Sequence, residues 1–283
     1  MSTTTTITAA EINKLRQATG AGMMDCRKAL TESDGDFEKA IDYLRKKGQK
    51  VAALRSDREA KEGVIIAKTT ANQKMGLIIT LACETDFVSK NAEFVAVAQN
   101  IMDVAIQNNV NTLEELQSSK LENATVADKI NDQVAKIGEK IQLTRFERID
   151  AEAVSSYIHG AYRMGVLVGL NKHTPEAIQA GREVAMQIAA MNPVAVDQDA
   201  VSPEMVAREK AIVTDQIRND PKMAGKPEEM IEKIALGKLN AFFKENTLTA
   251  QPYVKDASKT VGEHLKSVDP GLKVTLFKRV QLG

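Results

Sequence analysis

The chain has 283 residues, of which 43% are hydrophobic and 27% are charged, so its composition is that of a folded globular protein and excludes disorder as its main state. Lysine and arginine total 38, and aspartate and glutamate also total 38, which gives a formal net charge of zero. Proteins that bind DNA or RNA generally carry a basic excess, because neutralising phosphates supplies much of their affinity. We therefore expect no direct nucleic-acid partner.

The residue types exclude further classes of site. Two cysteines, Cys26 and Cys83, are too few for a disulfide framework or a cysteine-rich zinc site. The three histidines stand far apart in the sequence, so no metal-ligand cluster and no cofactor is expected. The chain begins without the basic and apolar regions of a secretory signal, and no apolar run reaches the roughly 18 residues that a membrane span needs. We expect a cytoplasmic protein without a membrane partner.

Residues 1–54 are predicted to form a module of three short helices. Thr8, followed by a glutamate three residues later, is typical of a capping box, and Gly20 is a natural end for this first helix. Asp36 is the predicted N-cap of the third helix, which places apolar residues at helical spacing. We expect Gly48 to end it.

The periodicity changes to that of β-strands after this module. Residues 63–68 and 75–81 are short β-branched runs separated by a turn-like segment, which predicts a β-hairpin. A helix is expected from about Asn91 to Gln107. These elements define a predicted first α+β half, residues 55–150.

A short internal repeat follows this pattern. Residues 74–79 resemble residues 163–168, an offset of 163 − 74 = 89 positions, and residues 97–101 resemble residues 184–188. A repeat of strand, turn, strand and helix predicts an α+β protein whose core consists of two related halves with small antiparallel sheets. The second half is expected to span residues 151–283.

Residues 202–246 interrupt the second half. Ser202 followed by Pro203 is typical of a helix start, and narrow apolar seams in otherwise charged segments predict an inserted antiparallel helical hairpin, a coiled coil. The chain is then expected to return through a helix at 258–266 and a strand at 273–278.

Catalysis by Cys83 with His159 is one functional hypothesis. Cys83 is expected at a strand end, but a reactive cysteine needs a close and oriented base, and no spacing in the sequence is diagnostic of one. A small buried cysteine is the better interpretation.

Two motifs contain apolar residues in polar surroundings. Met23 and Met24, at a glycine-flanked helix start, are either an adaptable contact surface or part of the module's core, and the residues alone leave both open. Phe87 lies in the polar connection between strand and helix, and is either a core anchor or an exposed wedge. The residues alone favour the anchor.

Four segments together carry a family resemblance: TGAGMMDCRKAL (19–30), ETDFVSKN (84–91), His159-Gly160 followed by RMGVLV (163–168), and QPYVKDASKTV (251–261). In this order they resemble the translation elongation factor Ts family, and together with the segments between them they cover about residues 7–277. The resemblance implies a guanine-nucleotide exchange factor for elongation factor Tu, which performs no chemical reaction of its own. It also implies that the N-terminal helices form a ubiquitin-associated-like module.

The resemblance assigns roles to single residues. It implies that the N-terminal module contacts the GTPase domain through Arg16, Met23, Met24 and Arg27, the last standing where the family often has lysine. It implies a wedge that disturbs the magnesium and phosphate site, formed by Thr85, Asp86, Phe87 and Val88. Further partner contacts are implied at His159, Val254 and Lys255. An additional C-terminal helical segment of some members, which also touches the partner, has no counterpart before Gly283, so we expect that contact to be absent.

A different class of function fits the N-terminal module taken alone. Small three-helix modules also occur in scaffolds that bind peptides or ubiquitin-like proteins. Such a scaffold without exchange activity is the alternative hypothesis, and recovery of a partner other than a GTPase would favour it.

Overall fold

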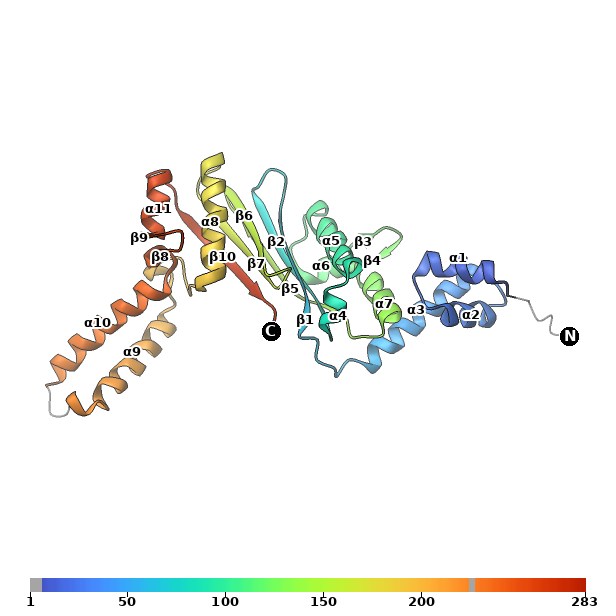
Figure 1. Ribbon diagram of the computed structural model, residues 1–283, viewed down its shortest axis with the longest axis horizontal. Helices are drawn as coiled ribbons and strands as arrows, with labels where there is room; N and C mark the ends of the chain where they lie inside the picture. Colours follow the sequence, from blue (N-terminus) through green and yellow to red (C-terminus); the bar gives the residue numbers. More distant parts are fainter. Residues whose placement is uncertain (1–6, 224–226) are drawn as a thin grey trace.

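The computed structural model describes residues 7–223 and 227–283. Figure 1 shows an elongated molecule, with the N-terminal helices at one end, sheets in the middle and a pair of long helices at the other end. Helices and small antiparallel sheets are both present, so the predicted α+β class is confirmed.

The N-terminal helices are α1 (Ala9–Thr19), α2 (Met23–Glu32) and α3 (Phe37–Leu54). They enclose a small core of their own, formed mainly by Leu15, Cys26, Ala29, Leu30, Ala40 and Leu44. The predicted capping box is confirmed, because the Thr8 side chain accepts from the Glu11 amide and Glu11 accepts from the Thr8 amide. Gly20 ends α1 in the left-handed conformation with φ 69°, and Asp36 caps α3, both as predicted.

The predicted end of α3 at Gly48 is wrong, because the helix continues to Leu54. Gly48 is buried against helix α7 (Val126–Ile137), where a Cβ atom would lie only 2.9 Å from the Asn131 carbonyl oxygen. This glycine therefore permits close packing of α3 on α7, a role that the sequence pattern does not distinguish from a helix end.

The first half of the core is an antiparallel sheet with the strand order β1-β2-β5. Its strands are β1 (Glu62–Thr69), β2 (Met75–Cys83) and β5 (Gln142–Asp150). The predicted hairpin is confirmed, with Ile66 paired to Ile79. Helix α5 (Ala92–Gln107) packs on the sheet and begins after Asn91, as predicted. The segment between α5 and β5, which the sequence pattern did not resolve, contains α6 (Leu113–Ser118), β3 (Lys120–Leu121), β4 (Ala124–Thr125) and α7.

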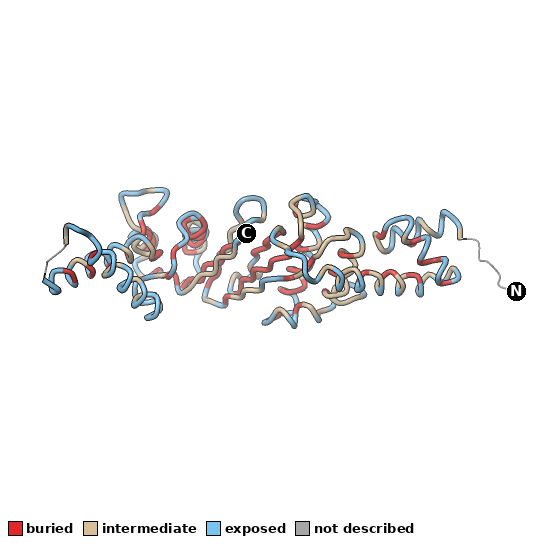
Figure 2. The backbone as a smooth tube through the Cα atoms, turned by 90° about the horizontal axis from the view of Figure 1, so that it is seen from below, coloured by how far each residue is buried: buried red, intermediate tan, exposed pale blue. Residues whose placement is uncertain are grey.

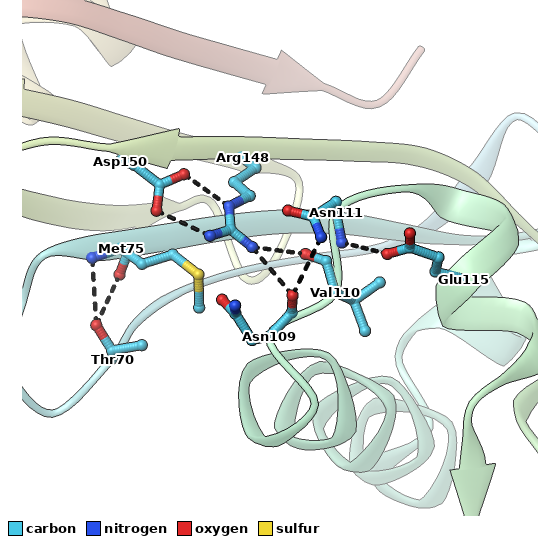
Figure 3. Close-up of polar contacts among 8 residues, drawn as sticks. All are labelled: Thr70, Met75, Asn109, Val110, Asn111, Glu115, Arg148 and Asp150. Atoms are coloured by element: carbon cyan, nitrogen blue, oxygen red, sulfur yellow. Dashed lines mark hydrogen bonds and ion pairs between the residues drawn. The ribbon is translucent and has the colours of Figure 1, made fainter.

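Arg148 on β5 fixes the end of α5 to the sheet (Figure 3). Its guanidinium donates to the carbonyl oxygens of Asn109 and Val110 at 3.2 and 3.0 Å. It also donates to both carboxylate oxygens of Asp150, at 2.6 and 2.9 Å. The loop that follows α5 is thereby held against the edge strand by charge-assisted hydrogen bonds.

The second half of the core repeats this arrangement. Its sheet has the order β10-β7-β6, formed by β6 (Ala153–His159), β7 (Met164–Leu170) and β10 (Val274–Gln281), and helix α8 (Pro175–Met191) covers it. The matching sequence segments lie in the central strands β2 and β7 and in the covering helices α5 and α8.

The sheets of the two halves pack on each other through a glycine of the repeat. A Cβ atom on Gly76 of β2 would lie 2.7 Å from the Val154 side chain, and one on Gly165 of β7 would lie 2.7 Å from the Ile65 side chain. The interface is apolar, with Ile65, Ala67, Ile78, Ile149, Val154, Leu167 and Leu282 buried in it. The same repeat position therefore allows close approach in both halves.

Helices α9 (Pro203–Arg218) and α10 (Glu228–Asn246) pack side by side in opposite directions and project from the second half (Figure 1). Ser202 caps α9 and Pro203 is its first residue, as predicted. Residues 224–226 of the predicted hairpin lie outside the described residues. Figure 2 shows that most of this pair is exposed; its buried residues are Ile217, Ile231, Ala235, Leu239 and Phe243.

The return segment differs in part from the prediction. Residues expected to begin a helix at Ser258 instead form β9 (Asp256–Thr260), which pairs with β8 (Pro252–Tyr253). Helix α11 (Val261–Val268) begins later because the Thr260 side chain provides its capping box. Short 3₁₀ turns at Gln198–Ala200, Pro221–Met223 and Leu248–Ala250 complete the connections.

Candidate functional site

A short loop, residues 84–90, joins the central strand β2 to helix α5 and contains the single-turn helix α4 (Asp86–Ser89). Phe87 lies on this turn with 85% of its surface exposed, so its interpretation as a core anchor is wrong. Val88, the next residue, packs against the hydrophobic core of the first half, and Ser89 is buried. Because Val88 occupies the side of the turn that faces the core, Phe87 is left facing solvent.

A carboxylate from another part of the chain holds the start of this loop. Glu139 Oε2 accepts hydrogen bonds from the amides of Glu84 and Thr85, at 3.1 and 3.0 Å. Glu139 Oε1 accepts a hydrogen bond of 2.6 Å from the Thr85 hydroxyl, which therefore does not cap α4 itself. The backbone of Glu84 and Thr85, which leads into the turn that carries Phe87, is thus fixed by charge-assisted hydrogen bonds.

The acidic side chains of the loop are held in their ionised form. The amide of Lys140 donates to Glu84 Oε1 at 2.6 Å and Arg55 Nη1 donates to the same oxygen at 2.8 Å, so the pKa of Glu84 is lowered, mainly by the Lys140 hydrogen bond. The Lys90 ammonium lies 2.6 Å from Asp86 Oδ2 and lowers the pKa of Asp86 through its hydrogen bond and its charge. Asp86 is therefore ionised and paired with Lys90 at the turn that carries Phe87.

Cys83 lies beneath the loop, and its surroundings oppose catalysis. Its thiol is fully buried and donates to the Thr85 carbonyl oxygen at 3.2 Å. Burial, together with the negative charges of Glu139 and Glu62, raises the pKa of Cys83 to about 12. Catalytic cysteines need a lowered pKa, so these surroundings disfavour the cysteine-enzyme hypothesis.

His159 lies on the second sheet, whereas Cys83 lies on the first. The exposed ring of His159 lies at the end of β6, where its Nδ1 is 2.9 Å from the Tyr157 hydroxyl. Within residues 7–223 and 227–283, no three histidine, cysteine or acidic side chains come together as metal ligands. Across the same described ranges, no helix has the length and apolar character to cross a membrane.

A second exposed apolar surface lies on the N-terminal module. Met23 and Met24, in the first turn of α2, are 52% and 73% exposed, so neither fills the module's core. Cys26 and Leu30 on the same helix occupy that core instead. The cationic residues predicted to contact a partner here, Arg16 and Arg27, are also exposed.

A third exposed position is the turn between β8 and β9. Val254 is 49% exposed, and its amide donates to Gln187 Oε1 at 2.8 Å. The Lys255 ammonium lies 3.0 Å from Glu183 on helix α8. The structure thus places the predicted residues on separate elements, namely α1 and α2, the loop with α4, the end of β6 and the turn after β8, which are spread along the molecule (Figure 1).

Comparison with known proteins gives the family. The family model described as elongation factor TS matches residues 84–283. "Elongation factor Ts" of Flavobacterium psychrophilum is 50% identical over 278 residues, covering 98% of this chain and 99% of the relative. The proteins of the same name from Christiangramia forsetii and Chlorobaculum tepidum are 48% and 41% identical, each over 98% of this chain and 99% of the relative. This chain belongs to the elongation factor Ts family.

The family membership makes the chain a translation elongation factor, and the resemblance expected from its sequence motifs is confirmed. The family model begins at Glu84, the first residue of the loop beneath Phe87. The relatives extend further and include the N-terminal module, since they cover almost the whole chain.

Three residues that hold the loop were missed by the sequence analysis: Arg55, Glu139 and Lys140. Glu139 and Lys140 lie more than fifty positions from Glu84 and Thr85, the loop residues that they contact. Neither residue stands in a recognisable local motif, since the groups that each one contacts are distant in the sequence. The nearby Gly138 gives the one local signal, a left-handed helix end after α7 at φ 80°.

Proposed function

We propose that this chain is the guanine-nucleotide exchange factor of elongation factor Tu in the cytoplasm. It binds the GTPase with GDP, promotes exchange of GDP for GTP and performs no chemical reaction itself, and it needs neither nucleic acid nor a membrane. The observation that carries the proposal is the 85% exposure of Phe87 on a loop held to the core by Glu139. A large exposed aromatic ring in a fixed position is typical of an interface anchor.

The mechanism follows from thermodynamic linkage. A nucleotide bound with nanomolar affinity is held by about 12 kcal/mol. An exchange factor accelerates nucleotide release by binding the empty GTPase more tightly than the loaded form. The effect is reciprocal: the bound factor lowers the affinity for the nucleotide by the same factor as the bound nucleotide lowers the affinity for the exchange factor. The contacts of the factor therefore have to conflict with those of the nucleotide.

Of the wedge residues Thr85, Asp86, Phe87 and Val88, Phe87 and Asp86 can supply this conflict, while Thr85 and Val88 hold the loop to the core. In the proposed complex the Phe87 ring enters a pocket of the GTPase and displaces groups that hold magnesium and phosphate. Asp86 brings a negative charge toward the same region, where the metal ion is the largest local charge. Because the loop is already ordered, little conformational entropy is lost when it binds.

The remaining surfaces are proposed to supply affinity. Arg16, Met23, Met24 and Arg27 bind the GTPase domain, with the N-terminal helices acting as a ubiquitin-associated-like module. Val254 and Lys255 make a further contact with that domain, and His159 faces the other domains of the partner. The pair α9 and α10 is an accessory hairpin.

The test is release of fluorescent GDP from purified elongation factor Tu, chased with excess unlabelled GDP. The chain should accelerate release in a concentration-dependent manner that saturates. Leu236→Ala, which removes a 59% exposed apolar side chain from α10, is the matched control for Phe87→Ala and should accelerate release as the wild type does. Binding without acceleration would contradict the proposal and favour a peptide- or ubiquitin-like-binding scaffold.

A further inference from the structure

We infer that Glu139 is a positioning residue of the exchange reaction: it fixes the backbone beneath Phe87 so that binding of the ring displaces groups in the partner instead of bending the loop. The inference rests on the proposed exchange function. It assigns to Glu139 a role that is separate from contact with the partner, because the hydrogen bonds of its carboxylate go to the loop's own backbone and hydroxyl.

The geometry of Glu139 fits this role. One carboxylate oxygen accepts two successive amides, Glu84 and Thr85, immediately before α4, and the other oxygen accepts the Thr85 hydroxyl. Helix α4 has only four residues and receives no capping bond from Thr85. A helix of one turn is not stable by itself, so its orientation depends on the groups that hold its first residues.

Lys140 holds the same loop from a second direction. Its amide donates to the Glu84 carboxylate at 2.6 Å. Its ammonium donates to the carbonyl oxygens of Ser56 and Arg58, at 2.7 and 2.9 Å, in the segment that leads from α3 to β1. Residues 139 and 140 thus fasten the loop both to the end of α7 and to the segment that follows the N-terminal module.

The stiffness of the loop matters because, when Phe87 enters the partner, the contact can deform either the loop or the GTPase site. If the loop bends more easily than the GTPase site, Phe87 turns back on contact and the magnesium and phosphate groups stay in place. The exposed surfaces at Met24 and Val254 lie on other elements, so their contribution to affinity does not depend on this loop. Loss of Glu139 should therefore lower the maximal release rate and leave affinity largely intact.

The experiment compares Glu139→Ala with Glu122→Ala, a matched control. Glu122 lies in the same half of the core and pairs with Lys129, away from the loop. Three quantities are measured: hydrogen exchange of the Glu84 and Thr85 amides in the free chain, affinity for elongation factor Tu, and the GDP-release rate at saturating concentration.

For Glu139→Ala we expect faster exchange at both amides and a maximal release rate about tenfold lower or more, since a displacement of about 1 Å at a reacting site can cost roughly a hundredfold. Affinity should change by less than about threefold, the range of an uncoupled surface substitution. Glu122→Ala should match the wild type in all three measurements. If Glu139→Ala does not fold, Glu139→Gln, which keeps one acceptor oxygen, is measured in the same way.

Two results would overturn the inference: unchanged exchange of the two amides, or an unchanged maximal rate while those amides exchange faster. A fall in affinity with a normal maximal rate would also contradict it, because Glu139 would then act in binding. If the wild-type chain does not accelerate release at all, the proposed function fails instead, and amide exchange separately shows whether Glu139 holds the loop.

Discussion

The loop at residues 84–90 and the first turn of α2 both expose large apolar side chains, but the backbone of the two segments is held in different ways. The loop follows β2, a central strand buried along its whole length, and Glu139 fixes it by hydrogen bonds. Met23 and Met24 stand at an N-terminus capped only by Gly22, on a module with a small core of its own. A rigid ring suits displacement of a partner's groups, whereas flexible methionines suit adaptable binding.

The largest expected effect is that of Phe87→Ala. If the ring makes its contacts only as the nucleotide leaves, about 2–4 kcal/mol of interface energy is lost from that state alone, so the maximal GDP-release rate should fall by roughly a hundredfold. The melting temperature of the free chain should hardly change, because the ring is exposed. Both are measured on the same preparation.

A large fall in the melting temperature of Phe87→Ala would contradict the assignment of Phe87 to an interaction surface. Replacing a buried phenylalanine by alanine costs about 3–5 kcal/mol of folding stability, which a thermal melt resolves easily. If Phe87→Ala melted early while its folded fraction released GDP normally, the ring would be a structural residue.

A smaller effect, on affinity alone, is expected on the N-terminal module. The double substitution Arg16→Ala and Met24→Ala removes one charge and one exposed apolar side chain. Truncating interface anchors typically costs about 1–3 kcal/mol, so binding to elongation factor Tu should weaken by about ten- to a hundredfold. Saturating protein should still reach the wild-type release rate, and equilibrium binding measured beside release kinetics distinguishes the two effects.

The sequence predicted local features better than tertiary ones. Caps at Thr8, Asp36 and Ser202 were predicted correctly, because a cap depends on residues within one turn. Gly48 was misread as a helix end, since a glycine that permits packing of α3 on α7 has the same local appearance.

The candidate site shows the same limit. The motif ETDFVSKN located the loop, but exposure of Phe87 depends on Val88 facing the core, which no local pattern gives. Glu139 was missed because its partners lie more than fifty residues away. The predicted domain boundaries at 54 and 150 stay predictions.

The outer part of the α9 and α10 pair should matter less than either surface. Its apolar cluster of Ile217, Ile231 and Ala235 is separate from the cluster at its base, where Leu239 and Phe243 pack on Ala195 and Val201. Replacing residues 210–236 by a short Gly/Ser linker should leave a cooperative thermal transition and most of the release activity. Loss of folded protein would show that the cluster at the base depends on the outer part.

The smallest effect is expected for Cys83→Ser beneath the loop. A serine hydroxyl can donate to the Thr85 carbonyl oxygen as the thiol does, so release should stay close to the wild-type rate. The raised pKa of Cys83, about 12, also predicts very slow alkylation at pH 8 in the folded chain, because almost no thiolate is present. Rapid alkylation with loss of activity would revive a catalytic role for this cysteine.

The contrast between the two surfaces is tested most directly by titrating GDP-loaded elongation factor Tu with the wild type, with Phe87→Ala and with the Arg16→Ala and Met24→Ala double variant. The release rate is followed to saturation in each case. We predict that Phe87→Ala lowers the plateau without moving the midpoint, and that the double variant moves the midpoint to higher concentration without lowering the plateau. A lowered plateau for the double variant, together with an unchanged plateau for Phe87→Ala, would contradict the account.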